Sequence, residues 1–248
     1  RLEWNYHDAK SQLGNLLDDI FKDTVESSRG KDVIIPLSGG FDSRLIACYF
    51  KKFKKKNVTC ITYGKKNNPE AIVSEKVAKT LGFNWKFIEY TDELIEGFVD
   101  SLSFQEYYKY AAQLVSMFFM QEYFAVKYLK ENNIFNDDAI FLPGFSADAL
   151  AGSHLSQFWV KRTIFCKGMF IKQILNKHYN YNAGPFPGDF YNKIEDRISW
   201  TNVYDYNLSD EWDFTERQAK FINNSARVFE FFGYGFRFPF WDIRLMDF

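Results

Sequence analysis

Two serines, two glycines and an aspartate gather in one short segment of the chain, Ser38-Gly39-Gly40-Phe41-Asp42-Ser43. Glycine lets backbone N–H groups approach a phosphate closely, serine adds hydroxyl groups, and an aspartate can hold a cation beside the phosphate. The segment follows the apolar run Val33–Leu37 and precedes a helix-like stretch, so it would open onto a helix N-terminus, which attracts anions. The Walker pattern G-x-x-x-x-G-K-[ST] does not occur in the sequence. The segment therefore predicts a phosphate-binding loop of another kind.

A second aspartate, Asp148, lies among small residues in the segment Pro143–Gly152. This segment comes directly after the apolar run Ala139–Leu142, which is typical of another buried strand. At neighbouring strand ends, Asp42 and Asp148 could share a Mg²⁺ ion on a triphosphate. The alternative is a tight turn in which Asp148 only caps the next segment. His154, six residues further on, is expected either to line the site or to make an ordinary polar contact.

Strand-like and helix-like patterns alternate around these two segments. A helix is expected over about Asp8–Glu26, and a long amphipathic stretch covers roughly Glu106–Lys130. The predicted strands are Val33–Leu37, Asn57–Tyr63, Asn84–Tyr90 and Ala139–Leu142. This rhythm predicts an α/β fold, a parallel sheet with helices on both faces and with ligands beyond the carboxyl ends of its strands.

The patterning divides the 248 residues into three parts. We expect an N-terminal helix in residues 1–30, an α/β core in residues 31–155, and a mainly helical, aromatic-rich portion in residues 156–248. Within the last part, Glu211–Phe232 has the clearest helical pattern.

Composition excludes several classes of partner. The 31 basic and 32 acidic residues nearly balance, so no nucleic acid partner is expected. The basic run Lys51–Lys56 is interpreted as a solvated helix end. The three cysteines form no C-x-x-C or metal-binding spacing, which favours a reducing compartment. Without a signal peptide or an apolar run of about 18 residues, we expect a cytoplasmic protein with no membrane partner.

Three segments, in this order, resemble signature blocks of the asparagine synthetase family: Ser38–Ser43, Pro143–Gly152 and Arg237–Asp242. The resemblance is to the C-terminal synthetase domain, an N-type ATP pyrophosphatase (PP-loop) domain, and it is thin between Ser156 and Trp212. It implies the adenine nucleotide alpha hydrolase-like (HUP) fold and an ATP-dependent carbon–nitrogen ligase. Such enzymes adenylate a carboxylate, release pyrophosphate, and let ammonia or an amine displace AMP to form an amide.

The resemblance also implies roles for individual residues. Asp42 and Asp148 would bind Mg²⁺ and, with Arg237, act in catalysis, while Phe145 and Arg227 would line the substrate pocket. ATP and its pyrophosphate would be bound at Pro36, Leu37, Ser38, Gly39, Gly40, Asp42, Ser43, Thr62 and Gly144. For the two arginines, an ion pair with Asp242 or a neighbour is the alternative to substrate contact.

The chain departs from the family pattern at positions that bear on the acceptor. Asparagine synthetases carry acidic residues where this chain has Phe145 and Ala149. An apolar wall at Phe145 argues for a small-molecule carboxylate other than aspartate, such as a sugar acid of surface polysaccharide. The family takes ammonia from glutamine, here through a glutaminase domain or subunit outside this chain. The family's catalytic lysine lies beyond the third block, so we expect these residues to be a fragment of a longer protein.

Two other functions remain open on the sequence. One is a tRNA-modifying or sulfur-transferring ATP pyrophosphatase of the same fold, which the missing C-x-x-C pairs and the balanced charge disfavour. The other is a nucleotide-binding scaffold that no longer catalyses. The sequence determines neither the acceptor, the nitrogen donor, nor the oligomeric state.

Overall fold

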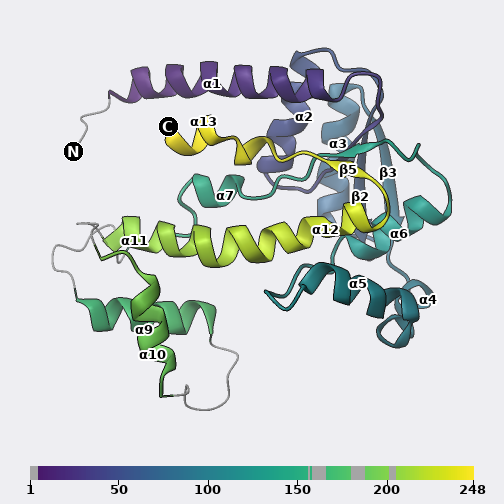
Figure 1. Ribbon diagram of the computed structural model, residues 1–248. Coiled ribbons are helices and arrows are strands. Elements are labelled where there is room, and N and C mark those ends of the chain that lie inside the picture. The colour runs from purple at the N-terminus through teal and green to yellow at the C-terminus, as the bar shows by residue number, and fades with distance from the viewer. Residues whose placement is uncertain (1–4, 156, 158–165, 180–187, 201–204) are drawn as a thin grey trace. The chain divides into compact units, whose positions relative to one another are not determined.

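Five parallel strands form one sheet (Figure 1). The structure is a computed structural model that describes residues 5–155, 157, 166–179, 188–200 and 205–248. The strand order is β3-β2-β1-β4-β5, and every neighbouring pair is parallel. The strands are β1 (Val33–Pro36), β2 (Val58–Gly64), β3 (Asn84–Glu89), β4 (Ile140–Phe141) and β5 (Gly235–Phe236). The predicted fold class, a parallel sheet with helices on both faces, is confirmed.

Each face of the sheet has its own apolar core, because successive strand residues point to opposite faces. Val33 and Ile35 pack in one core with residues of the first group of helices, and Ile34 packs in the other core with residues of the second group. The first group is α1 (Tyr6–Ser27), α2 (Asp42–Lys52) and α3 (Pro69–Leu81). The second group is α5 (Leu102–Ala112), α6 (Tyr123–Glu131) and α12 (Asn223–Phe231).

The chain divides into two units, each described here by itself. Unit 1 comprises residues 1–150 and 220–248, and unit 2 comprises residues 151–219. Unit 2 has a separate core around Phe170, Ile171 and Trp212. The elements among the described residues of unit 2 are α9 (Lys167–His178), α10 (Phe190–Arg197), α11 (Asp205–Trp212) and most of the π-helix η2 (Asp213–Ile222). The short elements of unit 1 are α4 (Asp92–Ile95), η1 (Phe98–Asp100), α7 (Ala147–Leu150), η3 (Pro239–Trp241) and α13 (Ile243–Asp247).

This division differs from the one expected at residue 156. Residues 220–248 belong with the α/β unit because β5 pairs with β4 and α12 packs against α5. A two-residue strand such as Gly235–Phe236 has no periodicity of its own. These two residues form a strand because they pair with β4 at the edge of the sheet.

The amphipathic stretch identified over roughly Glu106–Lys130 is not one continuous helix. Two helices, α5 and α6, replace it, and residues 113–122 between them are not helical. Gln113 and Leu114 both have positive φ, at 46° and 59°, which stops the first helix. The side-chain amide of Asn224 on α12 donates to the carbonyl oxygen of Ala112 at 3.2 Å, so a distant residue satisfies the helix end.

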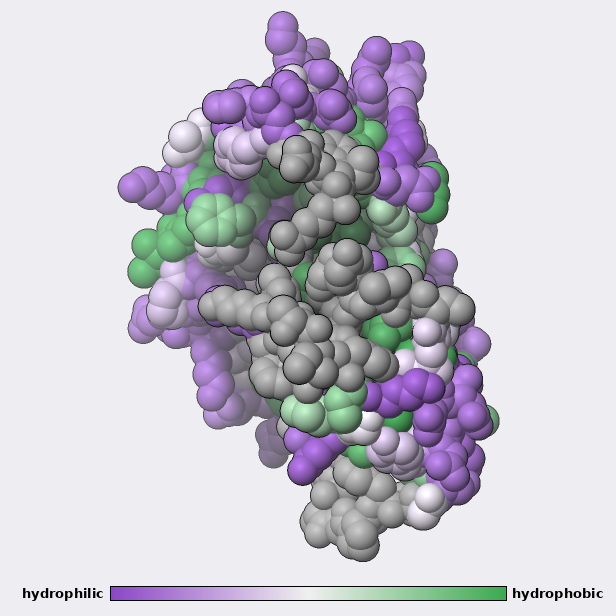
Figure 2. All heavy atoms as spheres, turned by 90° about the vertical axis from the view of Figure 1, so that its left-hand side faces the viewer, coloured by the Kyte–Doolittle hydropathy of each residue, from purple (hydrophilic) through white to green (hydrophobic). Residues whose placement is uncertain are grey.

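Helix α1 presents polar side chains outward and buries only Ile20 and Phe21. Figure 2 shows hydrophilic side chains gathered over the upper part of the view, where α1 lies in Figure 1. The guanidinium of Arg244 on α13 bonds Asp23 on α1 at 2.9 Å, which ties the last helix to the first. In the described part of the chain, no helix has both the length and the apolar character needed to cross a bilayer.

Candidate functional site

The loops that follow β1 and β4 meet at the carboxyl edge of the sheet. The strand order reverses at this point, because β2 and β3 lie on one side of β1 whereas β4 and β5 lie on the other. In open α/β sheets, ligands bind in the crevice at such a switch point. The first predicted motif follows β1 and the second follows β4, so the structure brings both to one place.

The loop Ser38–Ser43 is tied together by its own polar groups. The Ser38 N–H donates to the Ser43 hydroxyl oxygen at 3.1 Å, and the Gly40 N–H donates to the Ser38 hydroxyl oxygen at 3.1 Å. Arg44 donates to the Gly39 carbonyl oxygen at 2.9 Å. A trans peptide holds its C=O and N–H antiparallel, so fixing the Gly39 carbonyl also fixes the direction of the Gly40 N–H. These hydrogen bonds therefore fix the conformation of the loop and the directions of its N–H groups.

Helix α2 begins at Asp42, so the last two residues of this loop lie in its first turn. Its N-cap residue is Phe41, whose side chain makes no capping hydrogen bond. Phe41 is 81% exposed, and the guanidinium carbon of Arg44 lies 5.1 Å from the centre of its ring. The first N–H groups of the helix thus lack a side-chain cap and, with the positive end of the helix dipole, suit an anion.

Gly144 brings the second loop into contact with the start of α2. A Cβ on Gly144 would lie 2.9 Å from the Ser43 nitrogen and 3.1 Å from the Asp42 Cβ. Only glycine allows this approach of two backbones. Asp148 follows within α7, and its charge contributes, after burial, to raising the pKa of Asp42. Two carboxylates that repel one another in this way are suited to share a divalent cation.

Ser146 holds the second loop in an unusual conformation. Its φ is +70°, which non-glycine residues rarely adopt, and it is only 5% exposed. The indole N–H of Trp241 donates to the Ser146 hydroxyl oxygen at 2.7 Å. Trp241 belongs to the third sequence block, Arg237–Asp242, so this bond connects that block to the loop that carries Asp148.

Thr62 anchors the end of β1 with its side chain. Its hydroxyl donates to the Leu37 carbonyl oxygen at 2.8 Å, and the Trp85 indole donates to the Thr62 hydroxyl oxygen at 3.0 Å. Leu37 is buried, and Pro36, its neighbour, is the last residue of β1. These residues position Ser38, and their roles toward an adenosine remain expectations.

Phe145 belongs to a group of partly buried aromatic rings beside Gly144. Its ring centre lies 5.7 Å from that of Phe238 and 6.4 Å from that of Phe119. Phe119 in turn lies 4.3 Å from Phe221. The four residues come from four different segments, and the apolar wall expected from Phe145 alone is an assembly of rings.

The two predicted arginines have different surroundings. Arg237 is exposed and donates to the Phe236 carbonyl oxygen at 2.7 Å. Arg227 lies on α12 with its guanidinium carbon 4.7 Å from the ring centre of Tyr110. The carboxylate of Asp242, the partner considered in the sequence, pairs instead with Arg244 at 2.8 Å. That pair lowers the pKa of Asp242.

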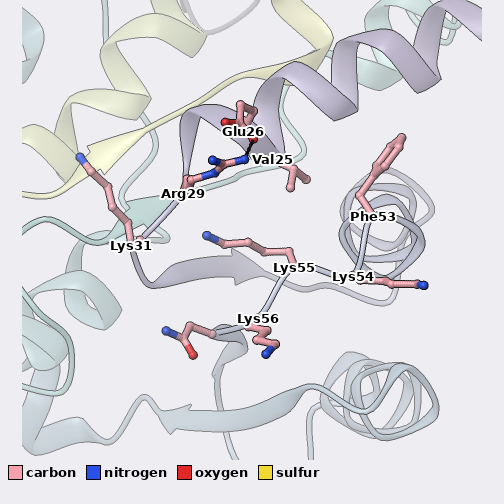
Figure 3. A pocket seen from close by; sticks show the side chains of 10 residues that line it. Val25, Glu26, Arg29, Lys31, Phe53, Lys54, Lys55 and Lys56 are labelled. Carbon is pink, nitrogen blue, oxygen red and sulfur yellow. Dashed lines mark hydrogen bonds and ion pairs between the residues drawn. The ribbon is translucent and has the colours of Figure 1, made fainter.

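A cavity of about 400 Å³ lies at the opposite edge of the sheet (Figure 3). Its lining includes Arg29, Lys31 and residues Lys54–Lys56, just before β1 and β2. Arg29 is paired with Glu26 at 2.7 Å, and Lys55 donates to the Ser28 carbonyl oxygen at the end of α1. Lysines at the ends of α1 and α2 complement the helix dipoles, which agrees with the interpretation of the basic run.

His154 makes a polar contact within unit 2. Its Nδ1 lies 2.8 Å from a carboxylate oxygen of Asp213, which is buried and also accepts from Gln218 at 3.0 Å. These bonds lower the pKa of Asp213 against the effect of burial. His154 and Asp213 thus join the two ends of unit 2.

Sequence reasoning did not assign a role to Arg44, Ser146 or Trp241. Arg44 had a local signal, because it directly follows the Ser38–Ser43 loop and a guanidinium is a strong donor to nearby oxygen atoms. The bond between Ser146 and Trp241 had none, because 95 residues separate them.

Comparisons with known proteins place this geometry in context. A family model described as asparagine synthase matches residues 15–160, more than half of the chain. No curated protein matches the sequence.

The chain was also compared with solved structures, and three similar ones have low sequence identity to it. An NH3-dependent NAD synthetase from Campylobacter jejuni is 15% identical, with 75% of this chain and 92% of that chain covered and a TM-score of 0.38. An NMN synthetase from Francisella tularensis is 15% identical, with 88% and 92% covered and a TM-score of 0.41. A protein from Methanocaldococcus jannaschii, described as a predicted subunit of tRNA methyltransferase, is 20% identical, with 78% and 91% covered and a TM-score of 0.29.

The close approach at Gly144 leads to a first prediction. Gly144→Ala places a methyl group against the backbone of Ser43 and should displace the Asp148 loop, weakening Mg-ATP binding at least about tenfold. Calorimetric titration with Mg-ATP measures this loss. Gly14→Ala is the matched control, because a Cβ there meets nothing within 4 Å. Equal affinity in the two variants would contradict the prediction.

The hydrogen bond between Trp241 and Ser146 leads to a second prediction. Trp241→Phe keeps an aromatic ring but loses the N–H, which should lower the free energy of unfolding by about 1 kcal/mol and weaken Mg-ATP binding several-fold. Trp200→Phe removes a comparable 3.0 Å indole bond within unit 2. This control, Trp200→Phe, should lose about as much stability as Trp241→Phe when both are unfolded in urea. Its affinity for Mg-ATP should stay that of the unmodified protein. A parallel loss of affinity in both variants would refute a specific role.

Proposed function

We propose that this chain, which belongs to the asparagine synthase family, uses ATP to adenylate a carboxylate and joins the activated carboxylate to ammonia or an amine. The observation that carries the proposal is the meeting of the Ser38–Ser43 loop with Asp42 and Asp148 at the β1–β4 edge. This arrangement provides N–H donors that suit phosphate oxygens and paired carboxylates that suit Mg²⁺, and both favour the binding of Mg-ATP.

The residues present fit Mg²⁺ and a triphosphate. Asp42 and Asp148 supply hard oxygen ligands, and their mutual repulsion is relieved by a divalent cation. Mg²⁺ typically binds through one or two carboxylates, with substrate phosphates and waters completing the octahedron. Among the described residues, no group of three or more histidines, cysteines or carboxylates could hold a metal without substrate. A bound Mg²⁺ would stabilise negative charge on the phosphates.

The Ser38–Ser43 loop would bind and stabilise the departing pyrophosphate. The Gly39 N–H and the start of α2 would donate to the phosphate oxygens, while the Gly40 N–H donates to the Ser38 hydroxyl oxygen. Charge grows on these oxygens as the bond to the α-phosphate breaks, so preorganised donors stabilise the transition state more than the ground state. Removing one such donor typically costs about 3 kcal/mol in the barrier.

The acceptor we propose is a carboxylate other than aspartate. Phe145, the residue after Gly144, forms an apolar surface with the rings of Phe119 and Phe238. This surface disfavours an acceptor that, like aspartate, would bring a second charged group against it. A sugar acid suits this wall, because the C–H groups on one face of a sugar ring pack against aromatic rings. Arg227 and Arg237 are proposed to bind the acceptor and to assist catalysis, respectively. Ammonia would reach the site from glutamine through a glutaminase domain or subunit, in the cytoplasm.

A direct assay tests the function. The full-length protein is incubated with Mg-ATP, ammonium and single members of a panel of amino acids and sugar acids, and pyrophosphate and AMP are quantified. We expect equal amounts of both with at least one carboxylate, and none with Asp42→Asn. Asp100→Asn, an exposed aspartate, serves as control. ATP cleavage that ignores every carboxylate would sink the proposal.

The coupling of the two carboxylates gives a prediction that needs no substrate. In Asp148→Asn the neighbouring negative charge is gone, so the pKa of Asp42 should fall from its raised position toward the ordinary value. Burial remains, so part of the shift should persist. NMR titration of the Asp42 carboxyl carbon in nucleotide-free protein measures this. An unchanged pKa would place the two carboxylates too far apart to share an ion.

A further inference from the structure

The cavity at the edge of the sheet opposite the phosphate loop is strongly basic. Its volume of about 400 Å³ is that of a small-molecule site. Two stretches of chain line it, one at the end of α1 and one at the end of α2, and Figure 3 shows their side chains on two sides of the cavity. The lining includes five basic residues: Arg29, Lys31, Lys54, Lys55 and Lys56. The candidate site at the other edge of the sheet does not use this cavity.

The positive charge of the cavity exceeds the negative charge around it. Glu26 is an acidic residue of the lining, and the charge of Asp32 acts on Lys55. The C-termini of α1 and α2 each contribute the equivalent of about half a negative charge. Against the five basic residues, these groups supply about three negative charges, which leaves a surplus of about two positive charges. An anion with two negative charges would balance it.

The lysines are not needed to close the helix that precedes them. The Lys54 N–H donates to the Lys51 carbonyl oxygen at 3.0 Å. The Lys55 N–H donates to the Phe50 carbonyl oxygen at 3.0 Å, so backbone bonds satisfy the last turn of α2. Within the ranges that the structure describes, three lysines of the lining make no ion pair and no side-chain hydrogen bond: Lys31, Lys54 and Lys56. Their ammonium groups remain available to a ligand.

Lys54 has a backbone conformation that favours glycine. Its φ is +55°, and it lies directly after the C-cap residue of α2, where glycine is the usual residue. A lysine at this position costs stability, which indicates that its side chain contributes something else. The N–H groups of Lys56 and Asn57 have no hydrogen-bond partner in the described part of the chain, so the same segment also offers backbone donors.

The rest of the lining joins a half-buried cation to an apolar surface. The ammonium group of Lys55 donates to the Ser28 carbonyl oxygen. Burial lowers the pKa of Lys55, and the charge of Asp32 opposes this effect. An anion in the cavity would favour the charged ammonium group further. Two apolar side chains, Val25 and Phe53, also line the cavity.

We propose that this cavity binds an organic phosphate monoester, with the phosphate group among the lysines and the apolar part against Val25 and Phe53. A phosphate monoester carries about two negative charges at neutral pH, which matches the surplus, and its three terminal oxygens can accept from donors on both sides of the cavity. Inorganic phosphate has the same charge but would leave the apolar side chains uncovered. The inference is independent of the proposed function, because ATP would bind after β1 whereas this cavity lies before β1.

Calorimetric titration with phenyl phosphate tests the site, since this probe joins a phosphate group to an apolar ring. The double variant Lys31→Gln/Lys56→Gln should bind phenyl phosphate at least about tenfold more weakly than the unmodified protein. Lys10→Gln/Lys76→Gln removes the same charge from exposed lysines outside the lining and should bind it unchanged. The NMR signals of the Lys56 and Asn57 amides should shift during the titration, which separates this site from binding at the phosphate loop.

Lys54→Gly separates the binding role of this lysine from its effect on folding. Glycine suits the positive φ, so the variant should melt roughly 2–3 °C higher than the unmodified protein. Its affinity for phenyl phosphate should nevertheless fall about threefold. A lysine with no part in binding would leave the affinity unchanged.

Several results would overturn the inference. Equal affinities in the two double variants, or amide signals of Lys56 and Asn57 that do not move, would refute the site. Inorganic phosphate that binds as tightly as phenyl phosphate would refute the apolar part of the ligand. Phthalate, which carries two carboxylates on the same ring, is the matched probe for the phosphate group. Equal affinity for phthalate would refute recognition of a phosphate.

Discussion

The contact between Gly144 and the first turn of α2 is the constraint on which the rest of the site depends. With a Cβ at residue 144 only 2.9 Å from the Ser43 nitrogen, the two loops can meet only if that position carries no side chain. The approach is possible because β4 lies beside β1, with Ile34 opposite Phe141. From this contact follows the proximity of Asp42 and Asp148, whose charge adds to the effect of burial in raising the pKa of Asp42. A phosphate loop without it would hold one carboxylate and no partner.

Side chains from other elements hold the backbone on each side of this contact. Thr62 on β2 donates a hydrogen bond to the Leu37 carbonyl oxygen, and Arg44 on α2 donates to the Gly39 carbonyl oxygen. Trp241 donates to the hydroxyl oxygen of Ser146, whose φ is positive. Buried or strained backbone of this kind is stable only when surrounding groups satisfy it. The site is therefore prepared by the fold, and the ligand does not have to organise it.

The aromatic residues of this chain serve two different purposes. Rings such as Phe141 and Phe229, with centres 4.5 Å apart, fill the sheet core as ordinary packing. At the carboxyl edge, Phe145 and Phe238 are only partly buried and form a surface. Elsewhere the Tyr63 hydroxyl donates to the buried carboxyl group of Glu122 at 3.0 Å.

The sequence by itself determined the place of the Ser38–Ser43 loop between a strand and a helix, and the alternation of strands and helices. Glycine freedom, hydroxyl groups, strand periodicity and helix caps such as Asn68, which accepts from the Glu70 N–H at 2.9 Å, act over a few residues and can be read locally. Only the tertiary structure decided that β4 lies beside β1, that residues 113–122 are not helical, and that residues 220–248 complete the sheet. The pairing of Ser146 with Trp241 and the burial of Glu122 were decided in the same way. These features depend on contacts between residues far apart in the chain, and their energies arise only when packing brings the partners together.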